Sequence, residues 1–175
     1  MKKWFLRILA ICLVVSIGLF IYGSTLGEIQ SKVEVIIDSD RTTVWNELQN
    51  PSGMDKWLED FKELEMTSSG VPGTVGTSYN LIFETGNGEA IIHQTLTEVV
   101  PAKRWTADFN STAFEGILVI ELDDHKDGTL VRVINTLEGT NALWKLLLHW
   151  NEEKMHATNQ KSYANLKSYV EQRHP

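Results

Sequence analysis

The chain has 175 residues with a single cysteine, Cys12, and its 16 Lys and Arg against 23 Asp and Glu give a formal net charge of -7. A single cysteine excludes a disulfide scaffold and a cysteine-ligated zinc site. The acidic excess also predicts no nucleic acid partner, because most of the surface would repel a polyanion.

The chain begins with an apolar run of 19 residues, 4–22, that carries one charge, Arg7. As a helix the run would be about 28 Å long, close to the hydrocarbon thickness of a bilayer. Trp4 and Tyr22 would then lie at the two interfaces, where aromatic side chains gather. The sequence therefore predicts that residues 1–23 form a transmembrane anchor, with membrane contact through 4–22.

Two interpretations of this segment remain open. Lys2 and Lys3 precede the run, whereas no Lys or Arg follows it before Lys32, so a retained anchor would leave the N-terminus in the cytoplasm and the domain outside. A secretory signal sequence has the same basic start and apolar middle, and its cleavage would release a secreted domain. The best pair of small residues near a cleavage position, Gly23 and Thr25, is poor, which favours a single-pass membrane protein.

The residues after the anchor divide into an expected tether, 24–30, and one domain, 31–175. That domain is long enough for one hydrophobic core and too short for two. It opens with a strand over 32–37, where β-branched residues gather. Asp38-Ser39-Asp40 predicts the cap of a short helix from Arg41, and a second helical piece over 54–58 presents Trp57.

Strands then dominate, because β-branched and aromatic residues alternate with polar ones. Breaks such as Pro101-Ala102 and Asp127-Gly128 separate several of them and are typical of hairpins. Sequential hairpins predict an antiparallel sheet. The predicted strands span residues 62–68, 78–84, 89–100, 104–110, 116–123 and 129–138.

The last segment, 141–172, changes to a helical period. We expect one long amphipathic helix that covers the apolar face of the sheet, since no other element is long enough. The predicted class is α+β, with a curved antiparallel sheet of six or seven strands wrapped around a long C-terminal helix. A gap at one end would form a ligand cavity. The apolar stripe consists of Trp144, Leu148, Met155, Leu166, Tyr169 and Val170.

The order of these elements and several short motifs resemble the START-like or SRPBCC superfamily, and within it the polyketide cyclase/dehydrase and lipid-transport group. The resemblance implies a helix-grip fold with a cavity for an apolar or amphipathic small molecule. It implies no single activity, because the superfamily includes lipid carriers, hormone receptors, aromatase/cyclases and chaperone activators. The matching residues are Val35-Ile36-Ile37, Thr43-Val44-Trp45-Asn46-Glu47-Leu48, Trp57, Gly73-Thr74-Val75-Gly76-Thr77, Val99-Val100-Pro101, Arg104-Trp105 and Asn165-Leu166-Lys167-Ser168-Tyr169-Val170-Glu171.

The resemblance also implies that the loop 69–73 lies near the mouth of the cavity. Its Ser-Gly-x-Pro string is similar to the gating loop of plant hormone receptors in the same superfamily. A plain turn is the other interpretation, because Gly and Pro are the residues that tight connections use.

Candidate ligand-binding residues come from the apolar faces of strands and helices. His93 alternates with Ile91 and Thr95, so its ring faces either the cavity or the solvent. No Ser/His/Asp or paired-carboxylate arrangement offers a nucleophile, so catalytic residues stay unassigned. The expected cavity wall consists of Trp57, Tyr79, Phe83, His93, Trp105 and Met155.

Binding or carriage of a hydrophobic small molecule or lipid, without covalent chemistry, is therefore the first functional hypothesis. The strand faces are mainly apolar, whereas an enzyme needs convergent titratable groups. The alternative is an aromatase/cyclase-type enzyme in which His93, Tyr79 or Arg104 polarises the carbonyl of a hydrophobic substrate. An interaction domain similar to the chaperone activators is disfavoured by the predicted export. No cofactor is expected.

Two clusters of acidic and histidine residues resemble metal-binding motifs but lack the ligands or the geometry that a metal site needs. The acidic run 123–128 opens like a calcium loop, but Ile134 stands where a bidentate Glu is needed, so we predict a hairpin turn. On the terminal helix we predict no metal site but two surface charge pairs, His149 with Glu153 and Glu152 with His156.

The start of the terminal helix, residues 143–150, is apolar nearly all round. Leu146, Leu147 and Trp150 fall outside the main apolar stripe. They either pack under the last hairpin or face the bilayer beside the anchor, where a lipid could enter.

Overall fold

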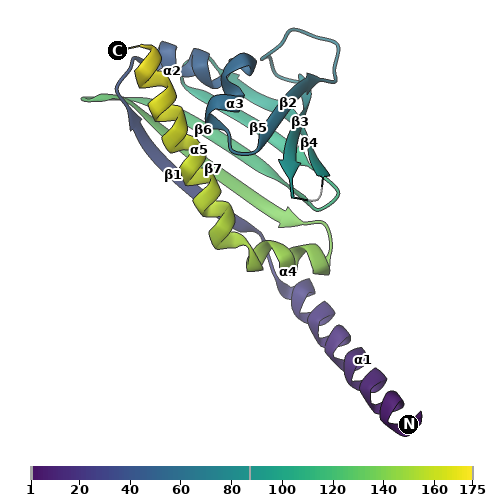
Figure 1. Cartoon of the computed structure of the whole chain (residues 1–175). Helices are drawn as coiled ribbons and strands as arrows, with labels where there is room; N and C mark the ends of the chain where they lie inside the picture. Colours follow the sequence, from purple (N-terminus) through teal and green to yellow (C-terminus); the bar gives the residue numbers. More distant parts are fainter. Residues whose placement is uncertain (1, 87, 175) are drawn as a thin grey trace.

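A computed structural model describes residues 2–86 and 88–174, so Met1, Asn87 and Pro175 lie outside the described residues. An apolar helix, α1, protrudes from an α+β domain in which helices cover one face of a sheet (Figure 1). The helical elements are α1 (Lys2–Thr25), α2 (Arg41–Leu48), the 3-10 turn η1 (Pro51–Gly53), α3 (Met54–Trp57), α4 (Ala142–Trp150) and α5 (Glu152–Arg173).

The predicted antiparallel sheet is confirmed and has seven strands in the order β1-β7-β6-β5-β4-β3-β2. Six strands form a meander from β2 to β7, and β1 pairs with β7 at the opposite edge. Every predicted strand is present, with its ends displaced by no more than three residues. The strands are β1 (Ile29–Ile37), β2 (Phe61–Met66), β3 (Ser78–Thr85), β4 (Gly88–Val100), β5 (Arg104–Asn110), β6 (Phe114–His125) and β7 (Gly128–Gly139).

The predicted cap of the first domain helix is present. The Asp40 carboxylate accepts hydrogen bonds from the backbone N–H groups of Thr42 and Thr43, at 2.9 and 3.1 Å. These bonds satisfy donors that the first turn of a helix leaves without partners, so α2 begins at Arg41. The chain then crosses from β1 to β2, at the other edge of the sheet, through α2, η1 and α3.

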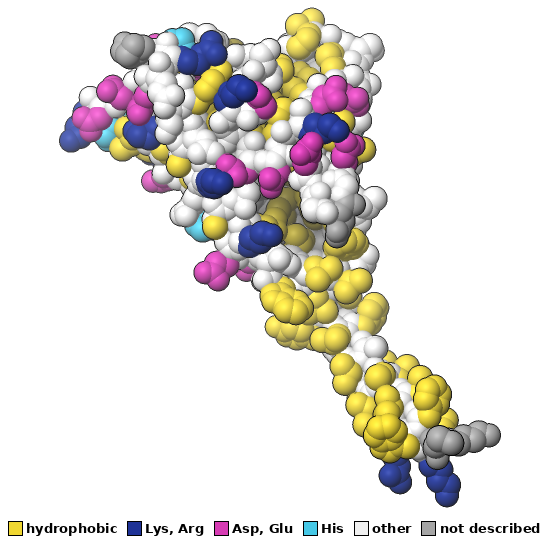
Figure 2. Space-filling model, viewed as in Figure 1, with side chains coloured by type: hydrophobic (Ala, Val, Ile, Leu, Met, Phe, Trp, Pro, Cys, Tyr) yellow, Lys and Arg dark blue, Asp and Glu magenta, His cyan; other side chains and the backbone are white. Residues whose placement is uncertain are grey.

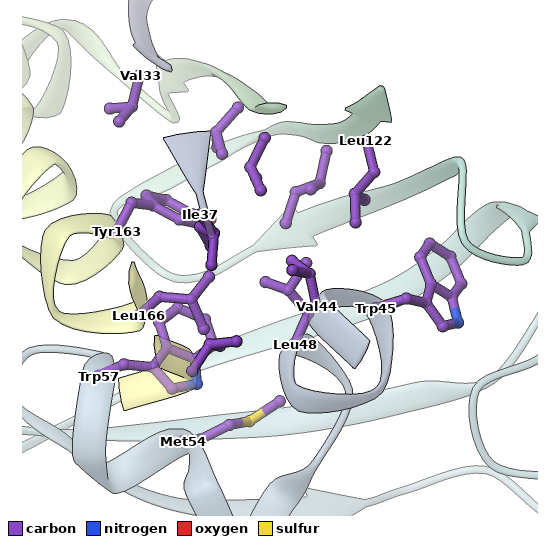
Figure 3. Packing of buried hydrophobic residues seen from close by; sticks show 14 residues of the cluster. Val33, Ile37, Val44, Trp45, Leu48, Met54, Trp57, Leu122, Tyr163 and Leu166 are labelled. Atoms are coloured by element: carbon purple, nitrogen blue, oxygen red, sulfur yellow. The ribbon is translucent and has the colours of Figure 1, made fainter. Parts of the chain in front are cut away.

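The main hydrophobic core lies where the C-terminal half of α5 packs against β1, α2 and α3. Leu166 and Val170 of α5 are fully buried, as are Ile37 and Val44. Figure 3 shows the side chains of Leu166, Ile37 and Val44 converging from α5, β1 and α2. These contacts fix α5 over one edge of the sheet, and they explain the apolar stripe in the sequence.

The prediction of one continuous helix over 141–172 is wrong, because the helix breaks at Asn151. The backbone there adopts φ -101° and ψ 7°, and α4 and α5 run in different directions (Figure 1). The Asn151 backbone N–H and side-chain amide both donate to the Leu147 carbonyl, at 3.1 and 2.8 Å. These bonds cap the end of α4, which then packs against β7 and α1 instead of continuing the axis of α5.

The N-terminal helix meets the domain at one close contact with α4. Gly23 is buried, and a Cβ atom at this position would lie 2.3 Å from the Ala142 carbonyl oxygen. The range expected to be a tether, 24–30, includes the end of α1 and the start of β1. Only three residues lie between these two elements. Among the described residues, Lys3–Thr25 is the one stretch of helix long and apolar enough to cross a membrane, a property that a signal sequence shares.

The core described above predicts a large stability loss in the variant Leu166→Ala. Leu166 is 0 % exposed, so the truncation removes buried apolar surface and leaves a cavity, lowering the free energy of unfolding by about 2–5 kcal/mol. Denaturant unfolding of the full chain in detergent measures it. The exposed Gln160 of the same helix supplies the control Gln160→Ala, with a change within about 0.5 kcal/mol. A loss below about 1 kcal/mol for Leu166→Ala would contradict this packing.

Candidate functional site

A cavity of about 710 Å³ lies between the inner face of the sheet and α5. Its size is within the range of small-molecule sites. Five of the six expected wall residues line it: Trp57, Tyr79, Phe83, Trp105 and Met155. They come from α3, the strands β3 and β5, and α5, so the fold brings together side chains that are far apart in the sequence.

The sixth residue, His93, was wrongly expected to face the cavity. Successive side chains of a strand point to opposite faces, and on β4 it is Ile92, Gln94 and Leu96 that line the cavity. His93 therefore lies on the outer face of the sheet. There its Nδ1 atom is 3.1 Å from Asn80 Oδ1 on the neighbouring strand, a hydrogen bond in which the ring N–H donates.

The other two groups proposed to polarise a carbonyl differ in their contacts. Arg104 forms ion pairs with Glu98 and Glu121, at 3.0 and 2.9 Å, and does not line the cavity. The Tyr79 hydroxyl lies in the wall and accepts a hydrogen bond of 2.8 Å from the Gly73 backbone N–H. His93, Tyr79 and Arg104 thus do not converge on one point, and general acid–base chemistry requires such convergence.

The cavity wall carries neutral polar groups that the sequence analysis did not identify. Within the described chain, neither Trp57 Nε1 nor Asn135 Oδ1 has a hydrogen-bond partner, although both atoms are buried. Burial raises the pKa of the Tyr163 phenol far above its ordinary value, so its hydroxyl stays protonated and can donate. Gln94 adds a buried amide. The wall therefore offers uncharged donors and acceptors on an apolar background.

Four of the described residues that line the cavity are charged. Asp60, Glu84 and Lys154 line it and are exposed to solvent. Glu59 accepts hydrogen bonds from Lys161 and Asn165, both at 2.8 Å. The bond from Lys161 is the main cause that lowers the pKa of the Glu59 carboxyl, which stays ionised near neutral pH.

One side of the cavity is formed by the connection between β2 and β3, residues 67–77. Pro72 and Gly73 of this connection line the cavity, as expected from the family resemblance. Gly73 and Gly76 have φ of +75° and +87°, a conformation that other residues rarely adopt. The hydrogen bond to Tyr79 helps to attach the connection to the sheet, as does the bond from the Gly76 N–H to the Leu96 carbonyl.

The histidines near the helix break do not form the predicted charge pairs. His149 Nδ1–H donates to the Lys145 carbonyl at 2.9 Å, and His156 Nδ1 lies 3.0 Å from Ser31 Oγ on β1. The break at Asn151 removes the one-helix spacing on which the pairing of His149 with Glu153 depended. In the part of the chain that the structure describes, no group of three His, Cys, Asp or Glu residues could hold a metal ion.

Comparison with known proteins identifies one family and many structures of the same fold. The family model described as polyketide cyclase/dehydrase and lipid transport matches residues 28–171. A search of the curated proteins finds no match.

Three similar solved structures illustrate the fold. A Chromobacterium violaceum protein is 18 % identical with a TM-score of 0.65, covering 81 % of this chain and 96 % of its own. A Staphylococcus aureus protein of unknown function is 13 % identical with a TM-score of 0.67, covering 86 % and 98 %. A protein from the dynemicin biosynthetic locus is 18 % identical with a TM-score of 0.60, covering 81 % and 47 %. At these identities the likeness shows the fold alone.

The contact between Tyr79 and Gly73 predicts that Tyr79→Phe loosens the connection 67–77. The substitution keeps the ring but removes the acceptor of the Gly73 N–H, at a cost of about 0.5–1.5 kcal/mol, so amide exchange of this connection should rise up to about tenfold. Hydrogen–deuterium exchange of the full chain measures it. Tyr169→Phe is the control, because among the described residues the hydrogen-bond partner of the Tyr169 hydroxyl is Arg173, on the same helix. Unchanged exchange at residues 70–77 would show that the contact does not hold the connection.

Proposed function

Because the chain belongs to the polyketide cyclase/dehydrase and lipid transport family, we propose that it is a membrane-anchored domain that binds or carries a hydrophobic small molecule or lipid. The observation that carries this proposal is the cavity of about 710 Å³, whose wall is largely apolar and whose described lining includes four charged residues, three of them exposed to solvent. A cavity of this kind favours transfer of an apolar molecule out of water. It also supplies none of the convergent titratable groups that catalysis would need.

The wall indicates what kind of polar group the ligand carries. Trp57 Nε1–H and the Tyr163 hydroxyl are neutral donors, and their rings are neighbours with centroids 5.8 Å apart. Asn135 Oδ1 is an acceptor without a partner among the described residues. A buried charge without a counter-ion would cost several kcal/mol, whereas a hydroxyl or carbonyl can pair with these groups. The proposed ligand is therefore a largely apolar molecule with an uncharged oxygen function.

The proposed anchor is α1, retained in the mature protein with its N-terminus in the cytoplasm. Support comes from its exposed apolar surface along Lys3–Thr25 and from the basic residues at its start. At Gly23, α1 also contacts α4 so closely that a Cβ atom would lie 2.3 Å from the Ala142 carbonyl oxygen. A signal sequence that is removed would not be expected to pack closely against the folded domain, so this contact supports retention of α1.

Retention of the anchor predicts the mass of the mature protein. Intact-mass measurement of the chain from the membrane fraction should give the full 19.8 kDa, because an uncleaved α1 stays in the bilayer. Recovery of a soluble product that begins near residue 24 would instead support secretion, and would leave the proposal for the cavity unaffected.

The cavity itself can be tested by photo-crosslinking in the membrane. The full chain is reconstituted in phosphatidylcholine vesicles that contain a diazirine-bearing long-chain alcohol, and labelled peptides are mapped by mass spectrometry. We expect labels on inner-face residues of β4–β6, and weaker labelling there with the corresponding fatty acid at neutral pH. Labels restricted to α1 and α4 would indicate membrane contact alone and overturn the proposal.

Two adjacent pairs of aliphatic residues provide matched variants for this experiment. Ile92 and Leu118 line the cavity, whereas Ile91 and Ile117 point outward and are half-exposed. The double substitution Ile92→Trp with Leu118→Trp should reduce cavity labelling roughly tenfold, because overfilling costs about 1–3 kcal/mol. Ile91→Trp with Ile117→Trp should leave labelling unchanged. Equal labelling of both double variants would show that the label does not enter the cavity.

A further inference from the structure

Helix α4 exposes apolar side chains although it belongs to a water-facing domain. Leu143 is 62 % exposed and Trp150 is 83 % exposed. Exposed apolar residues scattered singly need no explanation, but a contiguous apolar patch marks an interaction site. Leu148, on the other side of the helix, is buried against the sheet.

The polar groups of α4 are bonded to the helix itself or to the sheet. Lys145, its one charged residue, forms an ion pair with Glu138 of β7. His149 donates to the Lys145 carbonyl, and Asn151 caps the carbonyl of Leu147. At the other end, the Asn141 side chain accepts from the first backbone N–H groups, at 3.1 Å. The exposed side of α4 is left with few unmet hydrogen-bonding groups, as a surface in contact with lipid requires.

The position of α4 relative to α1 indicates what covers this surface. Ala142, the first residue of α4, contacts Gly23 of α1, one residue beyond the expected interfacial Tyr22. The start of α4 is therefore at the level where α1 would leave the bilayer. Figure 2 shows that the hydrophobic surface of α1 continues onto the adjoining base of the domain, beyond which acidic and basic side chains appear.

We propose that α4 is a second membrane-binding element that lies in the headgroup region of the bilayer crossed by α1. With nine residues it is only about 13 Å long and cannot cross the membrane, so it lies along the surface. Trp150 is of the residue type that gathers at this depth. Glu152 and Glu153 follow after Asn151 and are exposed, which places the start of α5 on the water side. The inference rests on the anchor of the proposed function.

In this arrangement one end of the cavity lies toward the membrane. Leu148 packs in a small cluster with Ile29 and Leu137, and Phe109 and Met155 pack against the same cluster. Leu137, Phe109 and Met155 also line the cavity. Helix α4 thus separates this end of the cavity from the bilayer, while the connection between β2 and β3 lies at the end of the domain away from α1 (Figure 1).

Nitroxide labels on the full chain in phosphatidylcholine vesicles test the depth of α4. The native thiol is removed by Cys12→Ser, and single thiols are introduced by Leu143→Cys and Trp150→Cys. Val75→Cys is the control, because Val75 is also apolar and 60 % exposed but belongs to the distant connection between β2 and β3. Power saturation compares collisions with oxygen, which concentrates in lipid, and with a water-soluble nickel chelate.

We expect the labels at 143 and 150 to show an oxygen-to-nickel collision ratio several-fold above that of the label at 75. Equal ratios at all three positions would overturn the proposal, because α4 would then lie in water. Low collision rates with both reagents at 143 and 150 would also overturn it, since a second copy or another protein would cover the surface. In either failure, photo-crosslinking inside the cavity would still support the proposed function, so the two failures are distinguishable.

Discussion

The docking of α5 on one edge of a curved sheet is the constraint on which the rest of the structure depends. Seven strands present more inner surface than one helix of 22 residues can cover. Helix α5 covers β1 and packs against α3, with Leu166 and Val170 buried in the contact. The inner side chains of β3–β6 are left facing space, and this space is the cavity.

The cavity wall follows from the same constraint. In a smaller sheet, inner-face side chains such as Trp105 and Leu118 would be packed in the hydrophobic core. Here they line the cavity. The neutral groups of Trp57 and Asn135 lie among them without partners within the described residues, at a cost that a bound ligand would offset. Of the charged residues that line the cavity, Asp60, Glu84 and Lys154 are exposed to solvent, and Glu59 forms an ion pair with Lys161. This division between neutral buried groups and exposed or paired charges favours binding over covalent chemistry.

The two ends of the domain differ in how they are closed. Near α1, Leu137, Phe109 and Met155 line the cavity and contact the small cluster that contains Leu148 of α4. At the other end it is bounded by a connection with two left-handed glycines, attached to the sheet in part by the hydrogen bond from Gly73 to Tyr79. The break at Asn151 matters most for this asymmetry, because it turns residues 142–150 out of the axis of α5 and onto β7 and α1.

Local patterns in the sequence determined the elements themselves. Runs of strand-forming residues and the turn residues between them located the seven strands, and Asp40 located the start of α2, because these signals depend on neighbours within a few residues. The apolar stripe through Leu166 and Val170 likewise identified the face of α5 that is buried. Together with the order of the elements, these patterns were enough to predict the fold and five of the side chains that line the cavity.

Only the tertiary structure decided which face of β4 points inward. Ile91, His93 and Thr95 alternate with Ile92, Gln94 and Leu96, so both faces mix apolar and polar residues, and periodicity cannot choose between them. The register with β3 and β5 made the choice, turning His93 outward and Gln94 inward. The break at Asn151 was decided in the same way, because α4 packs against β7 and α1, which are distant in sequence. Contacts between distant segments leave no local pattern, and these features therefore required the folded chain.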